Sequence, residues 1–94
     1  MQTDEYEWDD SKAAANRKKH GVTFEEAVTV FDDPRLKLQL DEEHSTSDEE
    51  RWHAIGFSNR VRLLVTVVVD RATRIRVISA RLANAREVLI YAEN

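Results

Sequence analysis

Apolar residues in the first third of the chain recur at the spacing of helices. Residues 11–19 contain three consecutive alanines, with Asp9 or Asp10 placed to cap the start and Gly21 to end the segment. Residues 23–31 have apolar side chains at the helical period, and Thr23 and Glu26 have the spacing of a capping box. An Asp-Asp-Pro sequence at 32–34 ends this second segment. The pattern predicts two helices, preceded by a short strand at residues 5–8.

The rest of the chain follows the alternation of strands. Residues 36–40 alternate leucine with polar residues, which predicts a strand with one buried face. Residues 52–58, 61–70 and 74–79 predict three more strands, and the short turns between them favour antiparallel neighbours. Residues 63–69 are almost all apolar, so this strand is expected at the centre of the sheet, covered on both faces. Asn84 and Glu87 have capping-box spacing and begin a last helix.

This order, β-α-α-β-β-β-β-α, predicts an α+β fold in which helices pack against an antiparallel sheet. The 94 residues contain no repeat or linker, so we expect one domain over residues 1–94. Both faces of the central strand are apolar, since residues 64, 66 and 68 alternate with residues 63, 65 and 67. The helices are expected to cover one face, and a partner protein or a second subunit would cover the other.

Charge is unevenly divided between the two halves of the chain. Residues 1–50 carry six Lys or Arg against fifteen Asp or Glu, a net charge of −9. Residues 51–94 carry eight arginines against three acidic residues, a net charge of +5, and the two sum to −4. Arginine is a permanent planar cation that fits phosphate oxygens, so the second half suits a polyanion despite the acidic total. Codon bias would explain the lack of lysine in this half equally simply.

Several functional classes are excluded by composition. The chain has no cysteine, so disulfides and thiolate chemistry are absent. No stretch approaches the roughly 20 apolar residues of a membrane-spanning helix, and the acidic N-terminus is unlike a secretory signal. His20, His44 and His53 lack the spacing of metal ligands, and there is no glycine-rich phosphate loop. We therefore expect a cytoplasmic protein without a metal or cofactor.

Two groups of residues are candidates for binding an anion. Lys12, Asn16, Lys19 and His20 share one edge of the first predicted helix, although a solvated helix face explains them as well. Arg81 stands where the last strand ends, a position that suits binding, and Arg51 is expected to meet it across the sheet ends. Arg74, Arg76 and Arg86 are equally typical of ordinary surface positions, Glu50 with Arg51 of a surface ion pair, and Glu87 of a helix cap.

Three blocks of residues occur in a characteristic order: Trp8, Asp9, Lys12, Asn16, Lys19, His20, Gly21, Phe24 and Ala27; His44, Ser45, Glu50, Arg51, Ile55 and Gly56; and residues 76–81 with Ala83, Glu87 and Tyr91. Together they strongly resemble the BrnT toxins of bacterial type II toxin–antitoxin systems, over about nine-tenths of the chain. One departure is Asn84, where Thr or Ser is usual. It preserves the helix cap.

The resemblance implies a RelE-like fold and a ribonuclease that blocks translation. It also implies a BrnA-like antitoxin with a DNA-binding ribbon-helix-helix domain, and a toxin dimer within a heterotetramer. Cleavage would need no metal, because RNA carries its own nucleophile, the 2′-hydroxyl. The residues expected to be catalytic are His20, Lys12, Glu50, Arg51 and Arg81. Those expected to bind RNA are Arg76, Lys19, Arg86 and Asn16.

Within the expected catalytic set, the arginines would neutralise charge that grows on the phosphate oxygens. His20 and Lys12 would transfer protons, with Glu50 as a further candidate base. A different class of function remains open. The same chain would serve as a non-catalytic or inactivated toxin fold that acts as the partner or co-repressor of a DNA-binding antitoxin.

Overall fold

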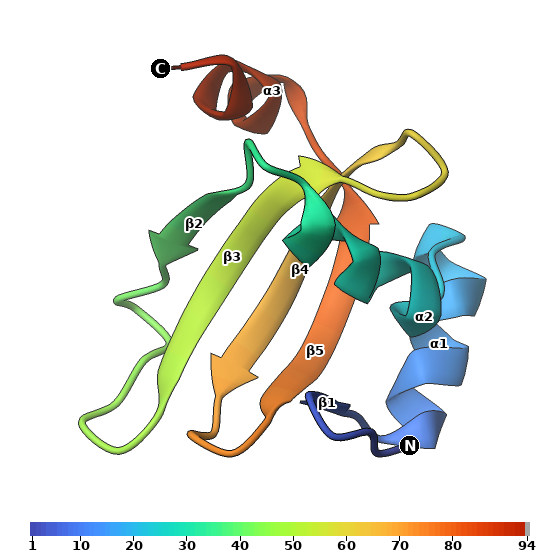
Figure 1. Ribbon diagram of the computed structural model, residues 1–94, viewed down its shortest axis with the longest axis vertical. Coiled ribbons are helices and arrows are strands. Elements are labelled where there is room, and N and C mark those ends of the chain that lie inside the picture. Colours follow the sequence, from blue (N-terminus) through green and yellow to red (C-terminus); the bar gives the residue numbers. More distant parts are fainter. Residues whose placement is uncertain (94) are drawn as a thin grey trace.

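A five-stranded sheet lies at the centre of the computed structural model, which describes residues 1–93 (Figure 1). Its strands are β1 (Tyr6–Glu7), β2 (Lys37–Leu40), β3 (Glu50–Phe57), β4 (Leu63–Asp70) and β5 (Ile75–Leu82), arranged in the order β1-β5-β4-β3-β2. The helices are α1 (Asp10–His20), α2 (Phe24–Ala27), the 3-10 helix η1 (Val28–Asp32) and α3 (Ala85–Ala92). The predicted α+β class is confirmed.

Strands β2 to β5 form an antiparallel meander, but the sheet as a whole is mixed. β1 runs parallel to β5, with Glu7 opposite Arg76. The expectation of a purely antiparallel sheet is therefore wrong for this first strand. The two residues are 69 positions apart, and no local pattern in the sequence records such a distant pairing.

The helix boundaries follow their local signals. Asp9 caps α1 by accepting a hydrogen bond from the backbone N of Lys12, and Gly21 ends the helix in the left-handed conformation with φ 68°. A side chain would be strained there, which is why glycine suits this position. At the start of α3, Asn84 and Glu87 form the complete predicted capping box.

The second predicted helix is shorter than its sequence pattern. α2 has four residues and then tightens into η1. Thr23 accepts from the backbone N of Glu26, at 3.1 Å, as a cap should. The Glu26 side chain, however, turns toward Ser58 and Arg62, so only half of the predicted capping box forms.

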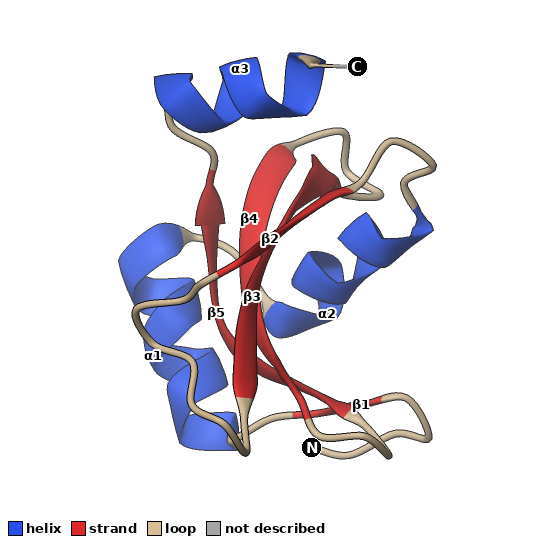
Figure 2. Ribbon diagram, turned by 90° about the vertical axis from the view of Figure 1, so that its left-hand side faces the viewer, coloured by secondary structure: helices blue, strands red, loops and turns tan. Residues whose placement is uncertain are grey.

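The sheet has two different faces. On the first face, α2 and η1 pack across the strands, and the Thr66 hydroxyl donates to the Ala27 carbonyl at 3.0 Å. Figure 2 shows α2 on one side of the sheet, with α1 displaced to the other side. α1 runs beside β5, and α3 lies at the end of the sheet (Figure 1). The buried core on the first face includes Val22, Phe24, Val30, Ala54, Leu64, Val68, Val77 and Ala80.

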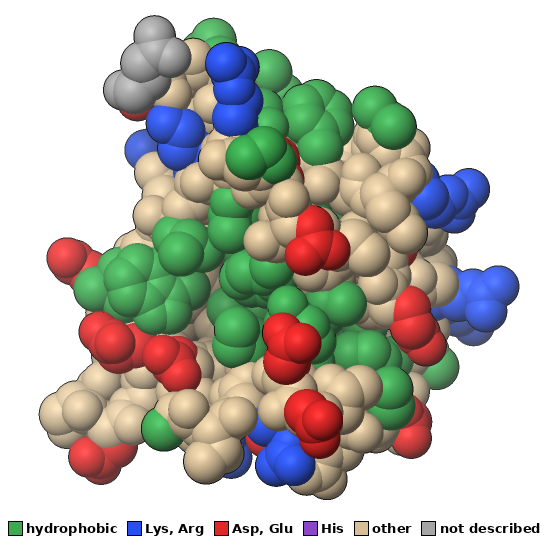
Figure 3. Space-filling model, viewed as in Figure 1, with side chains coloured by type: hydrophobic (Ala, Val, Ile, Leu, Met, Phe, Trp, Pro, Cys, Tyr) green, Lys and Arg blue, Asp and Glu red, His purple; other side chains and the backbone are tan. Residues whose placement is uncertain are grey.

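β4 is central and buried on both faces, as predicted, with Leu64, Val65 and Val69 almost without exposure. The strand predicted at residues 36–40 is present as β2, but the prediction that its leucine face is buried is wrong, because Leu38 and Leu40 are 54% and 38% exposed. β2 is an edge strand, and η1 does not extend over it. Figure 3 shows hydrophobic side chains gathered on this first face with acidic side chains around them.

Candidate nucleic-acid interface

The second face of the sheet carries arginines on both sides of apolar β4. Strand register places three rows across β3, β4 and β5: Arg51–Val69–Arg76, His53–Val67–Ser79 and Ile55–Val65–Arg81. Rows two residues apart are separated by about 7 Å, and β3 lies about 10 Å from β5. This strip therefore has two arginines at one end, a third at the other end and a histidine between them. We call these nine residues the basic strip.

Arg51 and Arg81 share this face but do not meet. They lie two strands and two rows apart, which separates their Cα atoms by roughly 16 Å. Arg51 is near the start of β3, and in an antiparallel meander the start of β3 lies beside the end of β4 and the start of β5. Arg76, rather than Arg81, is consequently the arginine opposite Arg51.

Two arginines of the basic strip are held by carboxylates. Arg81 makes a bidentate pair with Glu87, with nitrogen–oxygen distances of 2.7 and 2.8 Å. Arg76 donates to Glu7 on β1 at 2.9 Å. Both arginine side chains are about one third exposed or less, so the carboxylates fix their direction while part of each side chain remains open to solvent.

Glu87 has a second role that follows from its position in the chain. Its Oε1 accepts from the backbone N of Asn84 at 2.9 Å, which completes the cap of α3. The hydrogen bond from Arg81 holds the pKa of Glu87 below its ordinary value, against the opposing effect of burial. The sequence predicted the cap. The pairing with Arg81 was missed, although Arg81 is only six residues away.

Arg51 differs from the other two arginines. Its Nε is buried and has no hydrogen-bond partner among residues 1–93. No carboxylate within this part of the chain pairs with it, so its charge is the least compensated in the basic strip.

The middle of the basic strip holds a histidine, His53, whose spacing in the sequence bore only on metal binding. His53 Nε2 lies 3.1 Å from Asp41 Oδ2, and His44 Nδ1 lies 2.9 Å from the same oxygen. Asp41 follows β2 and packs back against the start of β3, where its backbone N donates to the Arg51 carbonyl. The spacing of two from Arg51 to His53 was the signal that places both on one face.

Lys12, Lys19 and His20 are separated along α1. Lys12 and His20 lie in its first and last turns, about 12 Å apart along the helix axis. Lys12 is near the Arg76 end of the strip, because α1 begins at Asp10, directly after β1, in which Glu7 lies opposite Arg76. Lys19 is exposed and His20 half-buried. One phosphate therefore cannot contact Lys12 and His20 together.

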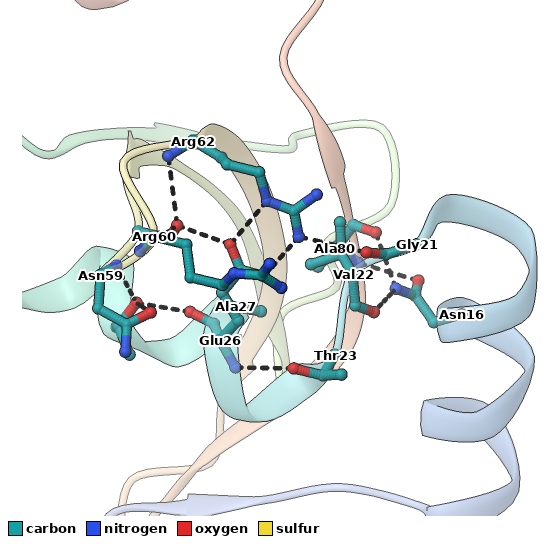
Figure 4. Close-up of polar contacts among 12 residues, drawn as sticks. Asn16, Gly21, Val22, Thr23, Glu26, Ala27, Asn59, Arg60, Arg62 and Ala80 are labelled. Carbon is teal, nitrogen blue, oxygen red and sulfur yellow. Dashed lines mark hydrogen bonds and ion pairs between the residues drawn. The ribbon is translucent and has the colours of Figure 1, made fainter.

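Asn16 is buried, and its side-chain amide is hydrogen-bonded to backbone groups of the protein. Its Nδ2 donates to the carbonyls of Val22 and Ala80 at 3.0 and 2.8 Å, and its Oδ1 accepts from the Ala80 N at 3.0 Å (Figure 4). The residue is 7% exposed. The amide side chain thus supplies hydrogen bonds to the part of the β5 backbone that β1 is too short to pair with. The expectation that Asn16 binds RNA is not supported by its position.

One of the eight arginines in residues 51–94, Arg62, forms an ion pair with the buried side chain of Glu26. Glu26 accepts hydrogen bonds from Arg62 and from the Ser58 hydroxyl, and Arg62 also donates to the Gly21 carbonyl (Figure 4). The hydrogen bond from Arg62 lowers the pKa of Glu26. Arg62 therefore joins the β3–β4 turn to the start of α2 and is not available to the basic strip.

Glu50 is on the other face of the sheet. It alternates with Arg51 along β3 and lines a pocket of about 250 Å³ with Phe31, Leu38, Trp52, Val68, Asp70 and Ile75. The structure does not bring Glu50 together with Arg51, His53 or Arg81. Arg86 is exposed in the first turn of α3, and Arg74 donates to the Thr3 carbonyl.

Within residues 1–93, no three His, Cys, Asp or Glu side chains are grouped to hold a metal ion. The helices of this part of the chain are too short and polar for any of them to cross a membrane.

Comparison with known proteins decides the family. The family model described as ribonuclease toxin, BrnT, of type II toxin–antitoxin systems matches residues 8–87. The chain belongs to the BrnT family. The matched range of this BrnT-family protein includes every residue of the basic strip.

A solved BrnT structure supports the same assignment. The fold is similar to the crystal structure of the Brucella abortus ribonuclease toxin BrnT, with a TM-score of 0.65 and 25% sequence identity. The similarity covers 87% of this chain and 99% of the Brucella chain. No curated protein sequence matches this BrnT-family chain.

Proposed function

We propose that this protein is an endoribonuclease toxin that binds RNA along the basic strip and cleaves it without a metal ion. The observation that carries the proposal is the register of β3, β4 and β5. It directs Arg51, Arg76 and Arg81 to one face, spaced over roughly 14 Å along the strands. That length suits a run of the RNA backbone and exceeds the size of a single phosphate.

Arginines supply the positive charge that the reaction requires at the phosphate oxygens. RNA supplies the nucleophile through its 2′-hydroxyl, so the protein must position it and stabilise charge that grows on the phosphate oxygens. One well-placed hydrogen-bond donor of this kind contributes about 3 kcal/mol to the transition state. Arg51 is the arginine of the strip without a carboxylate partner among residues 1–93, and we assign it the reacting phosphate. Arg76 and Arg81 hold the neighbouring parts of the strand.

Residues around the strip add to this arrangement. We assign Lys12 an electrostatic role beside Arg76, since both act on Asp9. Exposed Lys19 and Arg86 supply further positive charge for RNA outside the sheet. His20, half-buried at the end of α1, remains a candidate for proton transfer.

The proposal extends to the biological system. We infer a BrnA-like antitoxin with a ribbon-helix-helix domain, a toxin dimer within a heterotetramer, and growth arrest through blocked translation in the cytoplasm. A RelE-like fold is part of the same proposal. Membership of a type II toxin family supports an antitoxin partner and an RNA substrate for these inferences.

One observation favours the second candidate function, a non-catalytic binding module. The charges of Arg76 and Arg81 are already balanced by Glu7 and Glu87. A phosphate would compete with these carboxylates, and a module that only holds an antitoxin needs no free arginine.

Incubation of purified protein with end-labelled RNA, with and without EDTA, distinguishes the two functions. Cleavage that persists in EDTA and falls about 100-fold in Arg51→Ala supports the metal-independent enzyme. Arg60→Ala, an exposed arginine of the β3–β4 turn, is the matched control for loss of one positive charge. RNA that binds without being cut supports the module, and cleavage that stops in EDTA contradicts metal independence.

A further inference from the structure

The middle of the basic strip contains a histidine–carboxylate pair with the arrangement of a proton-transfer site. His53 lies in the row between the arginine ends, opposite Val67 on β4 and Gln39 on β2. Its side chain is 31% exposed, and that of Asp41 is 13% exposed. The imidazole is thus held from behind by a largely buried carboxylate while part of the ring remains open to solvent.

The charge of Asp41 fixes which ring nitrogen of His53 is available. Burial acts to raise the pKa of Asp41, but hydrogen bonds from His44 and His53 outweigh it and hold that pKa below its ordinary value. An ionised carboxylate only accepts hydrogen bonds, so His53 Nε2 and His44 Nδ1 must both donate to it. In a neutral imidazole with the proton on Nε2, Nδ1 carries the free lone pair.

The surroundings of His53 contain charges from each neighbouring element. Asp41 and His44 come from the loop after β2, Arg51 lies one row away on β3, and Glu87 of α3 acts on His53 electrostatically. β2, β4 and β5 present the uncharged Gln39, Val67 and Ser79 in the same row. Two carboxylates and one arginine therefore influence the imidazole, and only Asp41 is hydrogen-bonded to it.

We propose that His53, oriented by Asp41, is the general base that takes the proton from the RNA 2′-hydroxyl; this rests on the ribonuclease function proposed above. The proton moves to His53 Nδ1 as the 2′-oxygen bonds to phosphorus. The bond from phosphorus to the 5′-oxygen then breaks, that oxygen takes a proton from water, and the hydroxide so formed takes the proton back from His53. The products are a 2′,3′-cyclic phosphate and a 5′-hydroxyl, so no cofactor or outside reagent is consumed.

Position favours His53 over His20 for this role. His53 lies about 7 Å from the row of Arg51 and Arg76 and the same distance from the row of Arg81. A phosphate held by Arg51 would place its ribose over the middle row. His20 lies at the end of α1, next to Gly21, whose carbonyl accepts from Arg62.

The test is the pH dependence of single-turnover RNA cleavage by the full-length protein. We expect His53→Gln to lose about 100-fold or more of the rate and the rising limb of the pH profile. Asp41→Asn keeps an oxygen for the backbone N of His44, and we expect it to lower the rate and to alter the pH profile, because the carboxylate that orients the imidazole is gone. Asp48→Asn, in the same exposed loop, is the matched control. Added imidazole is expected to restore part of the activity of His53→Ala and none to Arg51→Ala.

The outcomes separate the two levels of the proposal. Wild-type protein that cleaves no RNA overturns the ribonuclease function, and the role of His53 with it. Wild-type protein that cleaves RNA while His53→Gln keeps its rate and pH profile overturns only the role of His53. Loss of the rising limb in His20→Gln, with His53→Gln unchanged, assigns proton transfer to His20 instead. Unfolding curves of each variant exclude loss of structure as the cause.

Discussion

Replacing Asn16 with alanine is expected to destabilise the protein strongly, although the substitution removes only an uncharged side chain. The Asn16 amide makes three hydrogen bonds to backbone groups of Val22 and Ala80, at 2.8 to 3.0 Å. In Asn16→Ala these backbone groups lose their partner, and those of Ala80 find no substitute in β1, which pairs with β5 only at Ile75 and Arg76.

The magnitude follows from the number of bonds lost. Each hydrogen bond contributes about 1 kcal/mol net, so the loss is about 3 kcal/mol. For a domain of this size 1 kcal/mol shifts Tm by roughly 4–8 °C, which gives a decrease in Tm of roughly 12–24 °C. Asn16→Asp should be at least as destabilising at neutral pH, because its second oxygen would face two carbonyl oxygens in place of donating to them.

Urea unfolding followed by circular dichroism measures this change, with Lys18→Ala on the exposed side of α1 as the control. The control should stay within about 0.5 kcal/mol of the wild type. An Asn16→Ala protein with wild-type stability would refute the assignment of Asn16 to the fold. If such a protein had also lost RNA binding, Asn16 would return to the RNA-binding residues.

Three further predictions concern charge and backbone strain. Glu26→Gln should make the free energy of unfolding fall less steeply as the pH is lowered. The hydrogen bond from Arg62 lowers the pKa of Glu26 below its ordinary 4.5. The stability that this ionised carboxyl contributes is present above pH 4.5 and is lost as the pH falls through its folded-state pKa. Unfolding free energies across the acid range measure it, and an unchanged slope would contradict it. Val61→Asn should raise stability by about 1 kcal/mol in the same assay, because Val61 has φ 59° and is 80% exposed. Arg81→Lys should not recover the RNA affinity lost in Arg81→Ala, since lysine lacks the planar fork that pairs with Glu87 and phosphate; equal affinity of Arg81→Lys and wild type in filter binding would argue against this.

Local signals in the sequence were sufficient to predict most helix boundaries and the meander. The caps at Asp9 and Asn84 and the glycine at position 21 act within a few residues, so their effect does not depend on the rest of the fold. The apolar run at residues 63–69 requires cover on both sides, which places β4 at the centre.

Features that depend on distant pairing could not be predicted in this way. β1 is two residues long, and nothing in its sequence indicates which strand it joins. The alternation of residues 36–40 predicted that Leu38 faces the core. Leu38 lies on the edge strand β2, however, and whether a helix covers that strand depends on the length of η1. α2 tightens into η1 and ends before it covers β2.

Only part of the candidate site was predicted, because the partners of its residues come from other segments of the chain. Arg76 and Arg81 were singled out by residue type and position, and both lie on the basic strip. Their carboxylate partners come from β1 and α3, and the partner of His53 comes from a loop. Glu50 was grouped with Arg51 because the two are adjacent, whereas adjacent residues in a strand point to opposite faces.

The parallel pairing of β1 with β5 has a consequence for the order of events during synthesis. The last strand of the sheet, β5, separates β1 from β4, and it contributes Arg76 and Arg81. A growing chain that ends before residue 75 therefore lacks both a place for its own N-terminal strand and two of its three aligned arginines. The long separation of β1 and β5 also favours late, slow closure of the sheet. The RNA-gripping surface that we propose is thus among the last parts of the protein to form as it leaves the ribosome.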